Sequence, residues 1–222
     1  MRVVIGDEII YHKGYEKITD FVIEKLASIQ KSGSKLCISV GGESGCGKTS
    51  LAYALQKDIE NNTGLKSFIF HLDDYFKLPP TDNHYARLND ISKVGSNEVN
   101  LDLLDSHLIH FKEKSRILNK PLVDYHQNKI LKEHISCSEF DFCIVEGTYA
   151  SLLKNPDYKL FIKTTYLETL NSRIERSRDI INDFNKKVLE IEHQIIRNHK
   201  GLADVIIDKD LRISKPKKQS ND

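Results

Sequence analysis

The stretch LCISVGGESGCGKT, residues 36–49, decides the fold class of this chain. It joins a short apolar run, Leu36–Val40, to a glycine-rich turn, and the segment Ser50–Asn61 follows directly. Apolar residues recur at helical spacing in Ser50–Asn61, whereas Leu36–Val40 is largely apolar on both of its faces. The sequence therefore predicts a strand, a glycine-rich loop and a helix in immediate succession.

The glycine-rich turn fits the pattern of a phosphate-binding loop, or P-loop, in which Gly, any four residues, Gly-Lys and Ser or Thr follow one another. Its glycines allow backbone amides to point inward at the positive end of the following helix, where they bind phosphate oxygens. In this pattern Lys48 carries charge to the β- and γ-phosphates of a nucleoside triphosphate, and the Thr49 hydroxyl ligates Mg²⁺. The predicted nucleotide-binding residues are Gly42, Glu43, Ser44, Gly45, Cys46, Gly47, Lys48, Thr49 and Ser50.

Further apolar runs and helical patterns alternate along the chain. The additional predicted strands are Ser67–Leu72, Phe142–Val145, Leu160–Lys163 and Val205–Ile207. The additional predicted helices are Tyr15–Gln30, Asn100–Lys114, Thr169–Arg178 and Asp183–Asn198. This alternation predicts an α/β fold of the P-loop NTPase type, with a five-stranded parallel sheet and helices on both faces.

We divide the chain into three parts. Residues 1–34 form an N-terminal extension, in which Val3–Ile5 and Ile9–Ile10 suggest a short hairpin before the helix. Residues 35–213 form the main domain, and residues 214–222 a disordered tail. Within the main domain, the weakly periodic stretch Tyr75–Glu98 is expected to form a functional loop or small lobe over the sheet edge.

The composition limits the class of partner. With 39% hydrophobic and 29% charged residues the chain should fold, and 33 basic against 32 acidic residues leave a net charge of +1. Such a balance gives no global attraction for nucleic acid or an anionic membrane. No window reaches the roughly 18 apolar residues of a spanning helix, and the first residues do not resemble a signal peptide. We therefore expect a cytoplasmic protein with a small-molecule partner, and the sequence leaves open whether it forms a homo-oligomer.

Four cysteines, Cys37, Cys46, Cys137 and Cys143, lack the paired spacing of a metal site and the density of a disulfide scaffold. We expect them to be reduced.

Two of the predicted strands end in carboxylates. Asp73 and Asp74 follow the second strand, and Glu146 follows the third. Because ligands of such sheets bind outside the carboxyl ends of the strands, these acids are expected to face the P-loop. One aspartate could then accept a proton from an attacking hydroxyl, although an Asp-Asp pair also commonly starts a turn. The predicted metal ligands are Thr49, Glu146 and Asp73.

The segment 173–179 is rich in arginine. Arg173 and Arg176 lie three residues apart and so share one helical face, with Arg178 close by. Arginines of this kind can neutralise charge at a transferring phosphoryl group, whereas a solvated charged face is the alternative interpretation. A guanine-reading Asn-Lys-x-Asp motif does not occur, and the chain is short for a motor ATPase. A small-molecule kinase is therefore the predicted class.

Five motifs in order make the chain resemble the uridine kinase and phosphoribulokinase family, over about residues 35–208. They are the P-loop, LDDYF at 72–76, PLVDY at 121–125, IVEGTY at 144–149 and ADVII at 203–207. The resemblance implies a kinase that uses ATP and Mg²⁺ to phosphorylate a sugar hydroxyl. It also implies that Asp73 is the base, that Glu146 lies near the metal, and that Arg176–Asp179 belongs to a lid at about residues 169–182.

The acceptor is less well defined by these motifs. The polar and aromatic candidates for acceptor binding are Asp74, Tyr75, Arg87, Tyr125, His126 and Tyr149. At the two positions where uridine kinases use Tyr and His for the pyrimidine base, this chain has Val123 and Asn128. We therefore expect a nucleoside or similar acceptor, with uridine a poor one. The alternatives are a kinase of a sugar phosphate or pantothenate-like metabolite, and a non-catalytic ATP-binding switch.

Overall fold

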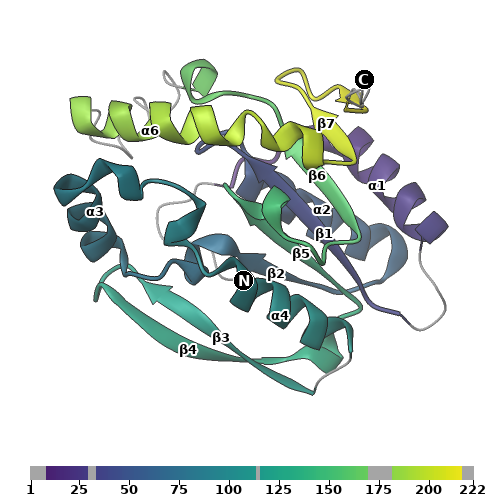
Figure 1. The fold of residues 1–222 in the computed structure, drawn as a ribbon. Coiled ribbons are helices and arrows are strands. Elements are labelled where there is room, and N and C mark those ends of the chain that lie inside the picture. The colour runs from purple at the N-terminus through teal and green to yellow at the C-terminus, as the bar shows by residue number, and fades with distance from the viewer. Residues whose placement is uncertain (1–8, 30–33, 114–115, 170–181, 217–222) are drawn as a thin grey trace, which may run out of the picture.

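The computed structural model describes residues 9–29, 34–113, 116–169 and 182–216. Within these ranges a central sheet lies between two layers of helices, and a separate two-stranded hairpin flanks it (Figure 1). The parallel strands of the sheet are β1 (Leu36–Gly42), β2 (Ser67–His71), β5 (Phe142–Gly147), β6 (Tyr158–Ile162) and β7 (Val205–Ile207). Their order is β2-β5-β1-β6-β7, which confirms the predicted five-stranded parallel sheet.

A sixth short strand extends this sheet. β8 (Ile213–Ser214) pairs antiparallel with β7, at the point where the sequence predicts the start of a disordered tail. Its pairing with Ile206 and Ile207 is a long-range contact, and a two-residue strand carries no periodic pattern of its own.

Helices cover both faces of the sheet because its strands are apolar on both sides. They are α1 (Tyr15–Ile29), α2 (Lys48–Thr63), α3 (Pro80–Asn89), α4 (Leu101–Lys112) and α6 (Asp183–Ile196). Short 3-10 turns occupy Leu72–Tyr75, Ile91–Lys93, Ser96–Glu98, Cys137–Glu139, Ala150–Leu152 and His199–Leu202. Of the predicted helix Thr169–Arg178, only Thr169 lies within the described residues.

Alternate residues of β1 and β5 enter two separate hydrophobic cores. Ile38 and Ile144 pack with α1 and α2 on one face. Cys37 and Cys143 pack with α4 and the end of α6 on the other. Every residue of both strands is buried, as expected for strands inside a sheet that is covered twice. All four cysteines carry free thiols.

The hairpin and α3 are features that the sequence pattern did not reveal. β3 (Ile117–Asp124) and β4 (Lys129–Ser136) pair antiparallel, and their turn lies beside the start of α3. α3 occupies part of the stretch predicted as a loop, and it starts with Pro80 in its first turn, where proline is favoured. Because α3 buries none of its residues, it lacks the apolar periodicity from which a helix is predicted.

The N-terminal helix belongs to the same core as the P-loop helix. Ile18 and Val22 of α1 are fully buried among residues of α2 and the sheet. Val3–Ile5, the first arm of the predicted hairpin, lies outside the described residues, and Ile9–Ile10 have no strand geometry. Within the described ranges, no helix is long and apolar enough to cross a membrane.

This packing predicts that α1 contributes to the stability of the whole domain. Ile18→Ala should lower the free energy of unfolding by about 2–5 kcal/mol, because it leaves a cavity in the core. The matched control is Ile29→Ala on the same helix, where the side chain is 38% exposed, and its effect should stay within about 0.5 kcal/mol. Urea unfolding measures both. Equal small effects would mean that α1 is not part of the cooperative unit.

Candidate active site

The P-loop connects β1 to α2 through a left-handed turn. β1 ends at Gly42 and α2 begins at Lys48, so the predicted succession of strand, loop and helix is confirmed. Gly47 precedes the helix with φ = 96°, a conformation that only glycine adopts readily. At Gly42 a Cβ would lie 2.7 Å from the carbonyl oxygen of Ile162. The loop therefore needs glycine at both ends, for backbone geometry at one and for space at the other.

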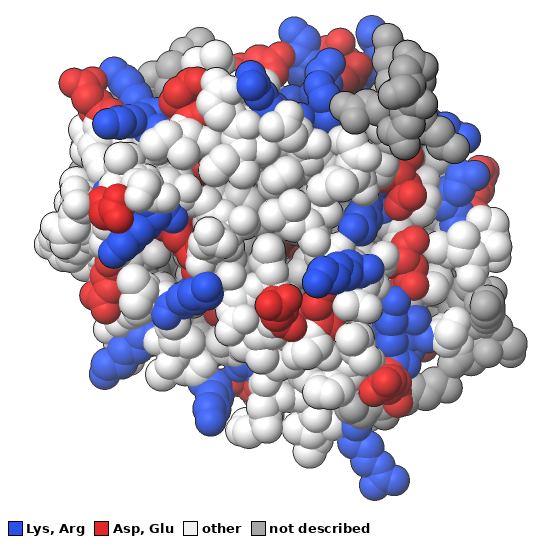
Figure 2. All heavy atoms as spheres, viewed as in Figure 1, with Lys and Arg blue, Asp and Glu red and all other residues white. Residues whose placement is uncertain are grey.

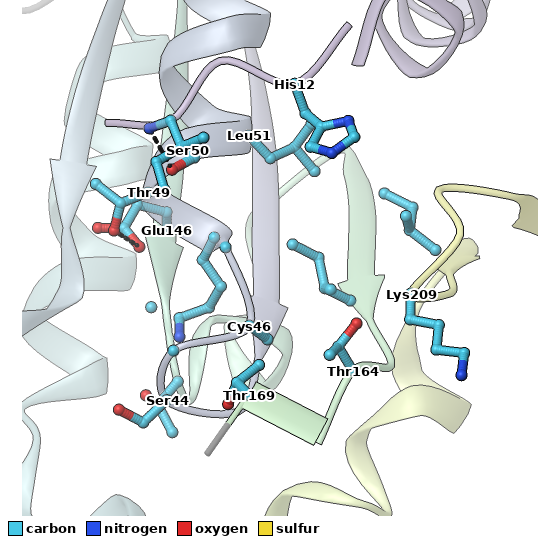
Figure 3. Close-up of a pocket in the computed structure, with 18 of the residues that line it drawn as sticks. His12, Ser44, Cys46, Thr49, Ser50, Leu51, Glu146, Thr164, Thr169 and Lys209 are labelled. Carbon is cyan, nitrogen blue, oxygen red and sulfur yellow. Dashed lines mark hydrogen bonds between the residues drawn. The ribbon is translucent and has the colours of Figure 1, made fainter. Parts of the chain in front are cut away.

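A cavity of about 810 Å³ opens beside this loop, at the carboxyl ends of the parallel strands. Its volume lies in the range of small-molecule sites. Residues 44–51 form its floor, and Figure 3 shows the loop running between the side chains that line it. The other strand ends contribute Asp73, Glu146, Gly147, Thr148, Thr164, Asp208 and Lys209. The strand ends thus meet where the fold class predicts a ligand.

Glu146 is held between the P-loop and β2. One carboxylate oxygen lies 3.4 Å from the Thr49 hydroxyl, and the other lies 2.8 Å from Nδ1 of His71. Burial alone would lower the pKa of His71, but the hydrogen bond and charge of Glu146 outweigh burial and raise this pKa above its ordinary value. The contact with His71 holds the carboxylate of Glu146, which lines the cavity, in one orientation.

Three oxygen donors that line the cavity are of the kind that Mg²⁺ binds. They are the Thr49 hydroxyl and the carboxylates of Glu146 and Asp73, and Asp73 is exposed. Mg²⁺ commonly takes one or two carboxylates and completes its coordination with water and phosphate oxygens. The described residues contain no cluster of three or more His, Cys, Asp or Glu side chains that would enclose a metal by themselves.

Glu43 belongs to the P-loop, but its side chain contacts other elements of the fold. Its carboxylate accepts a hydrogen bond from the Tyr166 amide at 2.8 Å and lies 2.7 Å from Nδ1 of His193 on α6. Its carbonyl accepts a hydrogen bond from the Lys48 ammonium at 2.8 Å. Glu43 therefore ties the P-loop to α6 and to the segment after β6. Nothing in the local pattern indicated Tyr166 or His193, because both contacts are long-range.

Asp73 and Asp74 face opposite ways although they are adjacent. Asp73 lines the cavity, whereas Asp74 is buried. Asp74 forms an ion pair of 2.6 Å with Lys120 and accepts a hydrogen bond of 2.9 Å from the Val123 amide. Lys120 is only 2% exposed and also contacts Glu133 at 3.0 Å. Asp74 therefore fastens the hairpin to the turn that carries Asp73.

The predicted acceptor residues are not brought together. Tyr125 lines the cavity and is 37% exposed. Tyr75 and Tyr149 are buried in the second hydrophobic core instead. His126 is exposed on the hairpin turn and is not part of the cavity lining.

Arg87 also lies away from the cavity and forms ion pairs between helices. It contacts Glu98 at 2.6 Å and Glu192 at 3.1 Å, which joins α3 to α6 away from the cavity lining. Arg173, Arg176 and Arg178 lie outside the described residues, as does the predicted lid except for its two ends. The basic and acidic side chains on the face seen in Figure 2 are interspersed.

Several cavity residues were not singled out from the sequence. Ile10, His12 and Tyr15 reach it from the N-terminal segment, and Leu211 reaches it from the loop after β7. The position of Thr164 and Asp208 just beyond apolar strands could have indicated them. The N-terminal residues carried no such signal.

A family model for the phosphoribulokinase/uridine kinase family matches residues 37–182. The chain belongs to this family. The members are phosphotransferases that act on alcohol groups, so membership supports an ATP-dependent kinase of a small molecule and P-loop binding of the nucleotide.

Relatives in this family differ in their named substrates. The chain is 26% identical over 191 residues to a bifunctional alpha-galactosidase/sucrose kinase of Mediterraneibacter gnavus, covering 80% of this chain but only 20% of that protein. It is 28% identical to a uridine kinase of Ureaplasma urealyticum, covering 78% of this chain and 88% of that enzyme. A solved structure of a possible uridine kinase from Bacillus stearothermophilus shares the fold, with a TM-score of 0.57 and 19% identity over 86% of this chain and 97% of that one.

The buried pair of Asp74 and Lys120 predicts a large loss of stability when one partner is removed. Lys120→Ala should lower the free energy of unfolding by about 3–5 kcal/mol, because it leaves the buried Asp74 carboxylate without its cation. Combining Asp74→Asn with Lys120→Met should restore part of that loss. Lys132→Ala, at an exposed site on β4, is the matched control. Denaturant unfolding of these variants, of the single variants Asp74→Asn and Lys120→Met, and of the unchanged chain measures the coupling. Additive losses in the double variant would contradict the interpretation.

Proposed function

We propose that the protein transfers the γ-phosphoryl group of ATP, in the presence of Mg²⁺, to a hydroxyl of a nucleoside or a similar small metabolite. One observation carries the proposal. Lys48, Thr49, Glu146 and Asp73 come from three different strand ends and line one cavity. Phosphoryl transfer depends mainly on alignment and charge neutralisation, and these residues supply both.

Each residue has a distinct part in the proposed reaction. The P-loop amides and Lys48 hold and neutralise the phosphates, while Thr49 and Glu146 hold Mg²⁺, which shields the charge of the phosphate oxygens when it is bound. Asp73 accepts the proton of the acceptor hydroxyl as that oxygen attacks phosphorus. The structure supports this choice because Asp73 is exposed to the cavity, whereas Asp74 is occupied by Lys120 and Val123. Arg173, Arg176 and Arg178 are proposed to neutralise the transferring group from the lid.

The hairpin residues Val123 and Asn128 support an acceptor that is not bound through a pyrimidine base. Val123 is 2% exposed and donates its amide to Asp74. Asn128 accepts a hydrogen bond from the Thr81 amide and donates one to Asp82, so its amide group joins the hairpin to α3. Neither side chain lines the cavity, and neither is free to hydrogen-bond a pyrimidine.

A sugar-type acceptor is the second candidate. The loss of the base-reading residues favours it, as does the similarity to a protein named a sucrose kinase. The similarity to a protein of Ureaplasma urealyticum named a uridine kinase supports a nucleoside acceptor instead.

A panel of acceptors tests the function directly. ADP release should depend on the acceptor. Uridine and cytidine should each give a kcat/KM below about 10⁴ M⁻¹s⁻¹, because Val123 and Asn128 provide no hydrogen bonds that would select a pyrimidine base. Sugars, sugar phosphates, pantothenate and nucleosides form the panel, with acceptor-free enzyme as the control. A higher value for uridine would refute the expectation for the acceptor. Absence of acceptor-dependent release across the panel would favour a non-catalytic ATP-binding switch.

Paired substitutions test the proposed role of Asp73 as the catalytic base. Asp73→Asn should lower kcat by about 10²–10⁴-fold and leave the KM for ATP within about twofold, because it keeps the shape and removes proton acceptance. Asp102→Asn, at an exposed site on α4, is the matched control. Asp74→Asn should affect stability more than chemistry. Full turnover in Asp73→Asn would remove this residue from the reaction.

A further inference from the structure

The segment Ile9–Tyr15, here called the N-terminal segment, lies outside the residues that match the family model, which begin at 37. It nevertheless packs along the P-loop helix α2. The Ile10 amide donates to the Ser50 hydroxyl at 3.3 Å, and the Tyr11 hydroxyl donates to Asp58 at 3.1 Å. The ammonium of Lys57 lies 5.6 Å from the centre of the Tyr11 ring. Contacts at two places on α2, about two helical turns apart, therefore fix the path of the segment.

The end of the N-terminal segment is wedged between the P-loop and the loop after β7. Tyr15 is 8% exposed, and its hydroxyl would lie 3.3 Å from a Cβ placed on Gly47. A Cβ on Gly14 would lie 2.5 Å from a methyl group of Leu211. Burial, with the nearby Cys46 thiol, raises the pKa of Tyr15, so the phenol stays neutral beside the phosphate-binding loop. The segment is thus packed against both elements that border the cavity on this side.

Side chains of the N-terminal segment enter the same cavity as the P-loop. Ile10 and His12 line it together with Ile207, Lys209 and Leu211. Figure 3 shows His12 and Lys209 on the side of the P-loop away from Thr49 and Glu146. Thr49 and Glu146 mark the proposed metal end, so a nucleotide whose phosphates follow the loop directs its ribose and base toward the opposite side.

The chemistry of that opposite side suits a flat heteroaromatic ring. Ile10 is 42% exposed and His12 is also exposed, so both present surface that a ligand can cover. Leu211, which is partly exposed, adds apolar surface to the lining, and the buried Ile207 lies behind that surface in the core. Aliphatic and aromatic side chains bind the faces of a base, and the nearby Lys209 and Asp208 offer polar groups for its edge or the ribose.

We propose that the N-terminal segment forms one wall of the base end of the nucleotide site, with Ile10 and His12 contacting the purine of ATP. The proposal rests on the proposed function in one respect, namely that the cavity binds ATP. It adds that part of the nucleotide site is built by residues that precede the family-matched region.

Two ligands separate the base end from the phosphate end. ADP carries the base, whereas inorganic tripolyphosphate carries phosphates alone, and calorimetric titration of the full chain measures the affinity for each. His12→Ala and Ile10→Ala should each weaken ADP binding by about tenfold, since base contacts of this kind are worth that much. Both variants should bind tripolyphosphate within about twofold of the unchanged chain, because the P-loop is untouched.

The chain offers matched controls on α4. Ile109 is 40% exposed and His110 is exposed, and neither lines the cavity, so Ile109→Ala and His110→Ala repeat the same chemical changes elsewhere. Both controls should bind ADP and tripolyphosphate as the unchanged chain does. Urea unfolding of all four variants checks that they remain folded.

The outcomes discriminate between the two proposals. Unchanged ADP affinity in both test variants would overturn the base-wall proposal and leave the proposed function standing. Equal weakening of ADP and tripolyphosphate would also overturn it, because the segment would then act by supporting the P-loop. If the unchanged chain bound neither ligand, the proposed function would fail and the base wall with it.

Discussion

The architecture depends on a single constraint, the reversal of the chain between β1 and α2. β1 lies inside the sheet, between β5 and β6, and is buried throughout, so the chain leaves it at the carboxyl edge of the sheet. There the chain must turn within the P-loop and start a helix that packs back on the same strand. The left-handed Gly47 makes this turn and places the N-terminus of α2, the end of a helix that favours anions, at the cavity. Every other site residue is placed relative to this turn.

Strand register then determines which side chains meet. Pairing of β1 with β5 sets Gly41 beside Gly147, and pairing of β2 with β5 sets His71 beside Glu146. Glu146 consequently reaches both the Thr49 hydroxyl and the His71 ring. Because the strands are parallel and in register at this edge, three segments far apart in sequence present polar groups to one volume. A shift of one residue in β5 would turn Glu146 to the opposite face of the sheet.

Ion pairs and a contact between a histidine and a carboxylate hold the elements that surround this edge. Asp74 and Lys120 join the hairpin to the turn after β2, and α6 makes two further links, from His193 to Glu43 and from Glu192 to Arg87. α6 therefore touches the P-loop at one point and α3 at another. Buried pairs of this kind add little net stability compared with apolar packing, but removal of one partner is costly, so they favour one arrangement of the parts over others.

The sequence by itself determined the parallel strands, the P-loop and most of the helices, because each rests on local spacing: apolar runs, helical periodicity and glycines at set intervals. It also indicated that Asp73, Glu146 and Thr49 would share one edge, since strand ends of a parallel sheet do. Only the tertiary structure decided which neighbouring side chain faces the cavity. In the 3-10 turn Leu72–Tyr75 the adjacent residues Asp73 and Asp74 differ, since Asp73 is exposed and Asp74 is buried. This difference depends on Lys120, which pairs with Asp74 from 46 residues further along the chain. The burial of Tyr75 and Tyr149 and the presence of His12 in the lining of the cavity have the same cause. Each depends on packing between distant segments, and local sequence periodicity contains no record of such contacts.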